Sequence, residues 1–193
     1  MPTIALPPVG HYALDPARTT IALSMKAMWG LVPVRATFAL RRGSVTVSSP
    51  TSAAVDVVAD TASFASGIAK RDAHVKSADF LDVTAYPDLT FAGDGLVSGG
   101  TSLRLRGVLT DRAAAPTELE ITELVIDDDR QGFAATATAT VLRQDVGITA
   151  TTGKVGKVIA VTITTHGRLS APWPSQAPGR SASSLGLHPP EGP

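Results

Sequence analysis

The stretch GFAATATATVLR at residues 132–143 alternates two kinds of side chain along almost its whole length. Its odd-numbered positions from Phe133 to Val141 are apolar, whereas three of its even-numbered positions are threonine. Successive side chains of a β-strand point to opposite faces, so a period of two is typical of a half-buried strand. The stretch therefore predicts a strand whose buried face is built largely from alanine.

The same alternation recurs on both sides of this stretch, between residues 10 and 169. Ile21, Leu23 and Met25 share one face near the start, and residues 159, 161 and 163 share one face near the end. Further strands are expected at residues 32–47, 53–61, 88–97, 102–110 and 118–127, from their β-favouring composition. Turn signals occur at residues 42–43, 49–50, 94–95, 99–100 and 115–116. We expect eight or nine antiparallel strands in one all-β domain.

Residues 66–81, SGIAKRDAHVKSADFL, interrupt this pattern. They mix charged residues with alanine and lack β-branched alternation, which predicts one helix or a helical loop inserted among the strands. Many strands with a single helical excursion favour a closed barrel over an open sandwich, because closure removes exposed sheet edges. About eight strands is also the smallest barrel that holds a ligand inside.

Composition divides the chain into three parts. Residues 1–9 are expected to form a flexible N-terminus, and residues 10–169 to form the barrel domain. From residue 170 to residue 193, 14 of 24 residues are Pro, Gly or Ser, which predicts a disordered tail. Trp173 is the exception within that tail, as an aromatic side chain between two prolines.

Charge and residue content exclude several classes of function. Seventeen basic residues balance seventeen acidic ones, which argues against electrostatic capture of nucleic acid. The absence of cysteine excludes disulfides and thiolate chemistry. The N-terminus MPTIALPPVG lacks a basic and an apolar segment typical of a secretory signal, and no stretch approaches a membrane span. These features predict a soluble, cytoplasmic protein, with no cofactor motif and no metal-ligand spacing among its four histidines.

Two features leave alternatives open. Arg71, Asp72 and His74 lie in the densest polar group of the chain, which is either the mouth of a binding site or a solvated helix surface. The alanines at positions 135, 137 and 139 either receive larger side chains from opposite strands or leave an apolar tunnel.

Several segments, in order along the chain, resemble the YceI-like family of lipocalin-like, polyisoprenoid-binding proteins. They are YALDPARTTIALSMK from residue 12, VRATF at 34–38, SFASGIAKRDAHVKSADFLDVTAYPDLTF at 63–91, LRLRGVLT at 103–110, GFAA at 132–135 and RQDVGI at 143–148. The resemblance implies an extended, eight-stranded antiparallel β-barrel with a helix near its opening. It also implies an apolar tunnel that holds a polyisoprenoid or a prenylated quinone, with no catalytic reaction attributed to the family.

Candidate ligand-binding residues follow from this resemblance and the alternation. The candidate wall residues are Leu23, Met25, Phe38, Phe64, Phe80, Phe91, Leu105, Phe133, Ala135, Ala137, Val146 and Ile148. The candidate mouth residues, taken from the matching motifs, are Arg71, Asp72, His74 and Arg143.

The chain departs from the family pattern at three places. Alanine stands at position 27, where a histidine is usual, and at position 36, where a glycine is usual. Val146 replaces the phenylalanine of an Asp-Phe-Gly motif, which would widen the adjacent wall if that side chain faces inward.

Three hypotheses for function remain. The first is a non-enzymatic lipid-binding barrel that stores, transports or sequesters an apolar chain, with a homodimer as one possible assembly. The second is a binding module with a filled core that acts through its surface or its Trp173 tail. The third is an enzyme that acts on an isoprenoid through His74 and Asp72.

Overall fold

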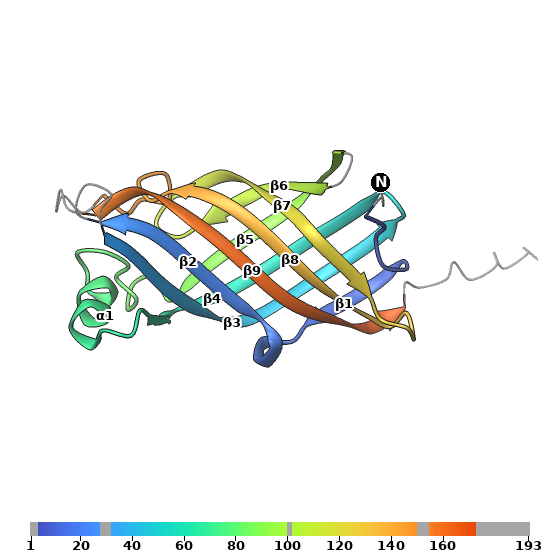
Figure 1. The fold of residues 1–193 in the computed structure, drawn as a ribbon, viewed down its shortest axis with the longest axis horizontal. Coiled ribbons are helices and arrows are strands. Elements are labelled where there is room, and N and C mark those ends of the chain that lie inside the picture. The colour runs from blue at the N-terminus through green and yellow to red at the C-terminus, as the bar shows by residue number, and fades with distance from the viewer. Residues whose placement is uncertain (1–3, 28–31, 100–101, 150–154, 173–193) are drawn as a thin grey trace, which may run out of the picture.

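Nine β-strands and one α-helix make up most of the residues that this computed structural model describes, which are 4–27, 32–99, 102–149 and 155–172. The strands are β1 (Gly10–Leu14), β2 (Thr20–Ala27), β3 (Val32–Ser49), β4 (Ser52–Ala65), β5 (Asp88–Gly99), β6 (Ser102–Thr110), β7 (Ala114–Ile126), β8 (Gly132–Leu142) and β9 (Val155–Pro172). The helix α1 (Ala69–Lys76) lies between β4 and β5, and a short 3-10 helix, η1 (Pro16–Arg18), separates β1 from β2. Figure 1 shows that the strands wrap into an elongated barrel.

The barrel closes through eight positions, although nine strands contribute to it. From β2 to β9 the strands follow one another around the ring, and β2 pairs with both β3 and β9. The short β1 pairs with the same two neighbours further along, so it continues the line of β2. The interruption between them is η1, where the Asp15 carboxylate accepts a hydrogen bond of 2.9 Å from the Ala17 N–H. The predicted eight-stranded antiparallel barrel is confirmed.

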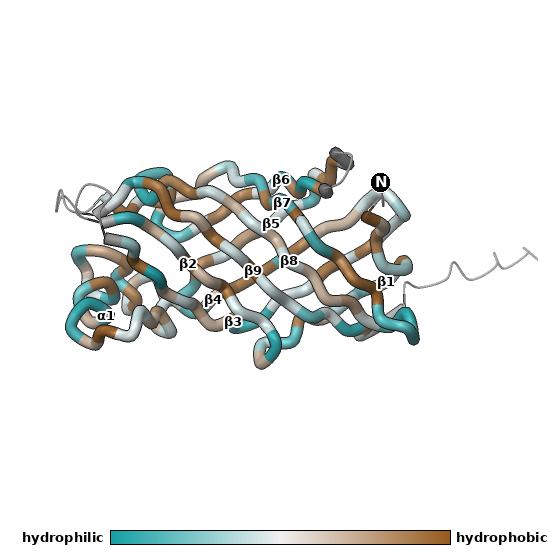
Figure 2. The backbone as a smooth tube through the Cα atoms, viewed as in Figure 1, coloured by the Kyte–Doolittle hydropathy of each residue, from teal (hydrophilic) through white to brown (hydrophobic). Residues whose placement is uncertain are grey.

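Alternation along the strands produces the core. On β8 the odd-numbered face predicted to be buried points into the barrel, where Phe133 and Val141 are 4% and 7% exposed. The opposite face points outward, and the Thr136 hydroxyl donates to the Glu123 carboxylate at the surface. Figure 2 shows the same alternation of apolar and polar residues along neighbouring strands. Alternate side chains of each strand therefore point into the barrel interior, and the side chains between them are solvated.

The helix occupies one end of the barrel, beside the turns that join two other pairs of strands (Figure 1). It spans Ala69–Lys76, within the predicted segment 66–81. The Arg112 side chain, in the turn between β6 and β7, donates to the Ala78 carbonyl at 2.9 Å. The Ala113 N–H of the same turn donates to the Val146 carbonyl in the loop after β8 at 3.2 Å. These contacts define the helix end of the barrel.

The turn signals at residues 42–43 and 94–95 lie within expected strands and produce no turn, whereas the turn expected at 115–116, between two strands, is wrong because β7 includes it. Residues 42–43 lie inside β3, where a Cβ on Gly43 would come within 2.8 Å of the Leu14 side chain, so this glycine allows a close approach and makes no turn. Residues 94–95 lie inside β5 at a register shift. Pro116 is the third residue of β7, a place near a strand start that proline tolerates. Consequently β7 begins four residues earlier than expected, at Ala114.

The predicted domain boundary at residue 169 falls three residues short of the end of β9. The strand continues to Pro172 because Gly10 and His11 of β1 pair with Pro172 and Ala171. Before β1, Pro7 is buried and the Tyr12 hydroxyl donates to the Pro8 carbonyl at 2.7 Å, so part of the expected flexible N-terminus contacts the barrel. The expected tail, including Trp173, lies outside the described residues from 173 onward.

Candidate functional site

An apolar cavity of about 70 Å³ lies inside the barrel. Seven strands line it, namely β2 and β4 to β9. The lining residues are Ile21, Leu23, Val57, Ala59, Leu89, Phe91, Leu109, Thr117, Leu119, Ala139, Val141, Val161 and Ile163. The Thr117 hydroxyl donates to the Ala115 carbonyl at 3.1 Å, which satisfies the one polar side chain of the wall. The wall is otherwise apolar among the described residues, so the cavity can hold apolar groups.

Register places these side chains at one level of the barrel. Leu23 and Ala139 both pair with Val161 of β9, from its two sides. Phe91 of β5 pairs with Leu109 of β6. Because Ala139 carries only a methyl group, it leaves space that the facing side chains do not fill. The alanine face thus borders an open space at Ala139, while the tunnel itself stays a prediction.

Of the twelve predicted wall residues, two line the cavity, Leu23 and Phe91. Six others are buried elsewhere in the barrel or at its end, and they are Phe38, Phe64, Phe80, Leu105, Phe133 and Val146. Four more are partly buried, namely Met25, Ala135, Ala137 and Ile148. Whether any of these twelve contacts a ligand stays a prediction.

Buried aromatic side chains meet in two pairs inside the barrel. The Tyr12 and Phe133 rings meet edge to face at 5.5 Å between centroids, and Phe38 meets Phe64 in the same way at 5.5 Å. Phe133 and Ala139 are six residues apart on β8, which is roughly 20 Å along a strand. Phe133 therefore lies well away from the cavity level of Ala139, whereas Phe91 lines the cavity.

The predicted mouth residues Arg71 and Asp72 use their polar atoms on Ser66. The Asp72 carboxylate accepts from the Ser66 N–H at 3.0 Å and also from the Ser66 hydroxyl. The hydrogen bond from the Ser66 hydroxyl is the main cause that holds the pKa of Asp72 below its usual range. Arg71 donates to the Ser66 hydroxyl at 2.7 Å and to its carbonyl at 3.0 Å. These hydrogen bonds connect the first turn of α1 to the segment that follows β4.

The other two mouth residues lie apart from this group. His74 is exposed, with its ring edge to face with Phe80 at 4.9 Å between centroids. His74 and Asp72 are two residues apart on α1, a spacing at which helical side chains do not face each other. Arg143 donates to the Ile148 carbonyl at 2.9 Å and so helps to close the loop that follows β8. The structure thus brings Arg71 and Asp72 together but does not join all four residues in one cluster.

Asp111 is a buried acid at the helix end of the barrel, and it was not among the residues predicted from the sequence. It is 8% exposed, and neither carboxylate oxygen has a hydrogen-bond partner in the described part of the chain. Burial raises the pKa of Asp111 to about 6, while the neighbouring Arg112 charge and backbone N–H act in the opposite direction. The sequence did contain one signal of this burial. Asp111 has an odd number, like Leu105 and Leu109 on the buried face of β6.

Ile21, Val161 and Ile163 of the cavity wall were on faces already recognised from alternation. Val57, Leu89 and Leu119 fell within expected strands without being selected. Periodicity identified the faces, but it did not give the level of the barrel at which space remains.

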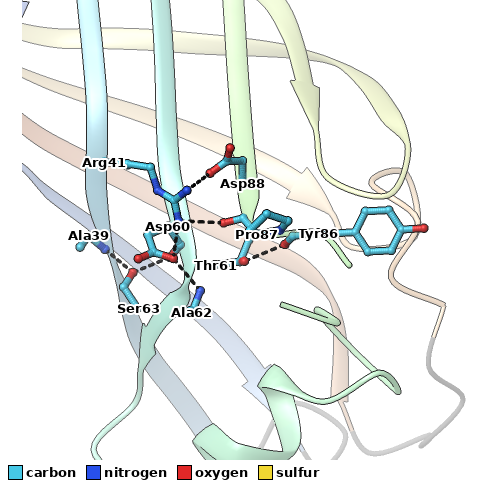
Figure 3. Close-up of polar contacts among 9 residues, drawn as sticks. All are labelled: Ala39, Arg41, Asp60, Thr61, Ala62, Ser63, Tyr86, Pro87 and Asp88. Atoms are coloured by element: carbon cyan, nitrogen blue, oxygen red, sulfur yellow. Dashed lines mark hydrogen bonds and ion pairs between the residues drawn. The ribbon is translucent and has the colours of Figure 1, made fainter. Parts of the chain in front are cut away.

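A polar network outside the cavity joins three strands near the same end (Figure 3). The Arg41 guanidinium contacts the Asp60 carboxylate at 3.1 Å and the Asp88 carboxylate at 2.7 Å. Beside it, the Thr61 hydroxyl donates to the Tyr86 carbonyl at 2.7 Å. The Ala39 N–H donates to the Ser63 hydroxyl at 2.7 Å, where β4 departs from regular pairing with β3. The contacts hold β3, β4 and β5 together near this end of the barrel.

Comparison with known families and proteins gives consistent matches. The family model for the YceI-like domain matches residues 12–166. Protein YceI of Shigella flexneri is 36% identical over 93 residues, which are 45% of this chain and 49% of that protein. A UPF0312 protein of Enterobacter sp. (strain 638) is 32% identical over 125 residues, which are 62% of this chain and 64% of that protein. The chain thus matches about half to two thirds of the length of these curated relatives.

Solved structures share the fold at low sequence identity. Burkholderia cenocepacia BcnA matches with a TM-score of 0.67 and 20% identity, over 79% of this chain and 98% of that one. A polyisoprenoid binding domain from Saccharophagus degradans, implicated in plant cell wall breakdown, matches with a TM-score of 0.59 and 14% identity, over 82% and 98%. Across the described residues, no helix is long and apolar enough to cross a membrane.

Proposed function

This chain belongs to the YceI-like domain family, and from that premise we propose that it binds a polyisoprenoid or a prenylated-quinone-type lipid inside its barrel. The proposed role is storage, transport or sequestration of that lipid. The observation that carries the proposal is the apolar cavity enclosed by seven strands. The polyisoprenoid-binding domain with the same fold gives it further support.

The energetics of such a site depend on buried hydrocarbon. Each CH₂ group transferred from water to an apolar wall contributes about 0.8 kcal/mol, so two isoprene units contribute roughly 8 kcal/mol before costs. Ordering of the chain and loss of translational freedom offset several kcal/mol of that sum. A tight complex therefore requires more than two buried units.

The size of the cavity bears on how binding occurs. An apolar cavity of about 150 Å³ is large enough for one benzene molecule, and this one is about 70 Å³. A chain of several isoprene units therefore requires the wall side chains to move apart. We expect that movement at aliphatic residues such as Leu89, Leu109 and Leu119, whose side chains change rotamer without breaking a hydrogen bond.

Native mass spectrometry of the purified full chain, followed by organic extraction, tests the proposal. We expect a bound species of a few hundred daltons or more with an isoprenoid fragmentation pattern. A lipid-free mass, together with no uptake of an added prenylated quinone or polyprenol, would overturn the proposal.

A binding module that acts through its surface is the second candidate, favoured by the small cavity volume. It predicts the lipid-free outcome just described, and folding that is unaffected by added lipid. An enzyme that uses His74 and Asp72 is less well supported, because one is exposed and the other is engaged by Ser66. We therefore propose binding and not catalysis. The homodimer and the cytoplasmic location stay predictions, which light scattering and cell fractionation test.

A further inference from the structure

The turn between β6 and β7 places an unusual group near the cavity. Asp111 is less than one tenth exposed, and both oxygens of its carboxylate lie out of contact with solvent without a hydrogen-bond partner in the described structure. A buried polar group without a partner destabilises a fold, so such groups call for a specific explanation. The turn uses the backbone N–H of Asp111 for a hydrogen bond to the Ala113 carbonyl, and the nearby Arg112 N–H lowers the pKa of the carboxyl without forming a hydrogen bond to it.

Asp111 follows directly on β6, whose odd-numbered side chains from Leu103 to Leu109 lie on the buried face of the strand. Leu103 and Leu105 are buried and Leu109 lines the cavity, whereas the intervening Arg104, Arg106 and Val108 are exposed. Asp111 is the next position of the buried series. It lies two residues beyond Leu109, which is roughly 7 Å along a strand.

The surroundings of Asp111 connect it to the same cavity. The Ala113 N–H of its turn donates to the Val146 carbonyl. Val146 packs in a small cluster with Val141 and Leu109, two residues that line the cavity. The turn that carries the carboxyl thus lies at the helix end of the barrel, beside residues of the cavity wall.

A hydrogen-bond donor accompanies the acid. The Nε of Arg112 is buried and has no hydrogen-bond partner in the described part of the chain. The rest of this guanidinium is engaged, because one terminal nitrogen donates to the Ala78 carbonyl and the group lies over the Tyr86 ring at 5.3 Å. One acceptor group and one donor are therefore available in adjacent residues of one turn.

We propose that Asp111 and Arg112 bind the head group of the lipid, and that this head group is a hydroxyl. A hydroxyl donates to the Asp111 carboxylate and accepts from Arg112 Nε, so it satisfies both groups at once. A hydrocarbon end satisfies neither, and a diphosphate would place negative charge beside a buried acid. The inference rests on the proposed function and specifies it, since it selects an isoprenoid alcohol or hydroquinone among the possible lipids.

Three probes of one chain length test the head group. They are geranylgeraniol, its methyl ether, which accepts but does not donate a hydrogen bond, and geranylgeranyl diphosphate. Affinities for the purified full chain are measured by titration from cyclodextrin and checked by native mass spectrometry. We expect the wild-type protein to prefer the alcohol over the ether by roughly tenfold. In Asp111→Leu that preference disappears, while the affinity for the ether stays within about threefold of wild type.

Two further variants keep the test decisive. Asp111→Asn retains an acceptor of the same shape, so it should fold and keep most of the preference even if Asp111→Leu does not fold. Asp145→Asn, at an exposed acid in the nearby loop, should behave as wild type. A preference for the diphosphate, or a preference for the alcohol that survives in Asp111→Leu, would overturn the head-group assignment alone. No binding of any probe by the wild-type protein would overturn the proposed function and this inference with it.

Discussion

The carboxylates of Asp60 on β4 and Asp88 on β5 occupy directly paired positions, and both contact the guanidinium of Arg41 on β3. Side chains in such a pair lie about 4.5–5.5 Å apart at Cβ, where like charges repel. The positive charge of Arg41 offsets this repulsion, and its two contacts connect three neighbouring strands (Figure 3).

Replacement of Arg41 by glutamine should therefore destabilise the barrel, because it leaves the two acids opposite each other without a counter-charge. All three side chains are partly exposed, so we expect a loss of about 1 kcal/mol in the free energy of unfolding. Urea denaturation measures it. The loss should shrink in high salt. Arg42→Gln, at the exposed neighbouring residue, is the control, and an equal loss there would contradict the role of the pair.

A larger side chain at Ala139 should remove lipid binding and leave the fold intact. Ala139 lines the cavity, so the added atoms of Ala139→Leu occupy the space that the proposed chain requires. We expect the co-purifying lipid to fall at least tenfold by native mass spectrometry, roughly 1.4 kcal/mol or more. Thr140→Leu is the matched control, because the next residue of β8 points outward and is exposed. Equal lipid loads in the two variants would argue against the cavity as the binding site.

Restoring an aromatic ring at position 146 should reshape the helix end of the cavity. Val146 is 3% exposed and packs on residues of the cavity wall. Val146→Phe should reduce lipid uptake and lower the free energy of unfolding by about 1–3 kcal/mol through overpacking. Val158→Phe, at an outward position that is 49% exposed, should change neither quantity by much. An unchanged lipid load in Val146→Phe would show that this wall does not limit the ligand.

Asp111 should make the protein more stable as the pH falls from 8 toward 4. Burial raises its pKa from 3.8 to about 6 in the folded state, so the folded protein binds this proton more tightly than the unfolded chain. Stability from this group is present below pH 4 and is lost as the pH rises through 6. The difference is on the order of 1–3 kcal/mol.

Asp111→Asn separates this effect from those of other acids. Asp72, for example, has a lowered pKa, so its contribution to stability is lost as the pH falls. The variant should be more stable than wild type at pH 8, and the difference should vanish near pH 4. Thermal unfolding across that pH range measures both. Parallel stability curves for wild type and variant would contradict the burial of a charged group at this position.

The all-β class and the inward faces were readable because alternation is a local property. On β8 each side chain takes the face opposite its neighbour, so residues 133–141 reveal the buried face without any knowledge of partner strands. The helix was readable for the same reason, as a segment in which the alternation stops. The eight-stranded count rested on the family resemblance, since neither periodicity nor composition shows that β1 and β2 share one position in the ring.

Local signals failed where pairing decided the outcome. Pro116 was expected in a turn, yet it lies in β7 because long-range pairing with β6 outweighs a weak local preference. The role of the mouth residues stays a prediction, but their contacts also depend on the fold. Arg71 and Asp72 are polar in any context, and only the fold brings Ser66 close enough to use both of them.

The sequence by itself determined that strands dominate, which face of each strand is apolar, and that a helical segment interrupts them. Tertiary structure alone decided where the interior stays open, because a cavity is the volume left when side chains from seven strands meet at one level. It also decided that Asp111 is buried, since that depends on the helix, the β6–β7 turn and the loop after β8 converging at one end. Periodicity acts between neighbours along a chain, whereas volume and desolvation arise between residues that are far apart in it.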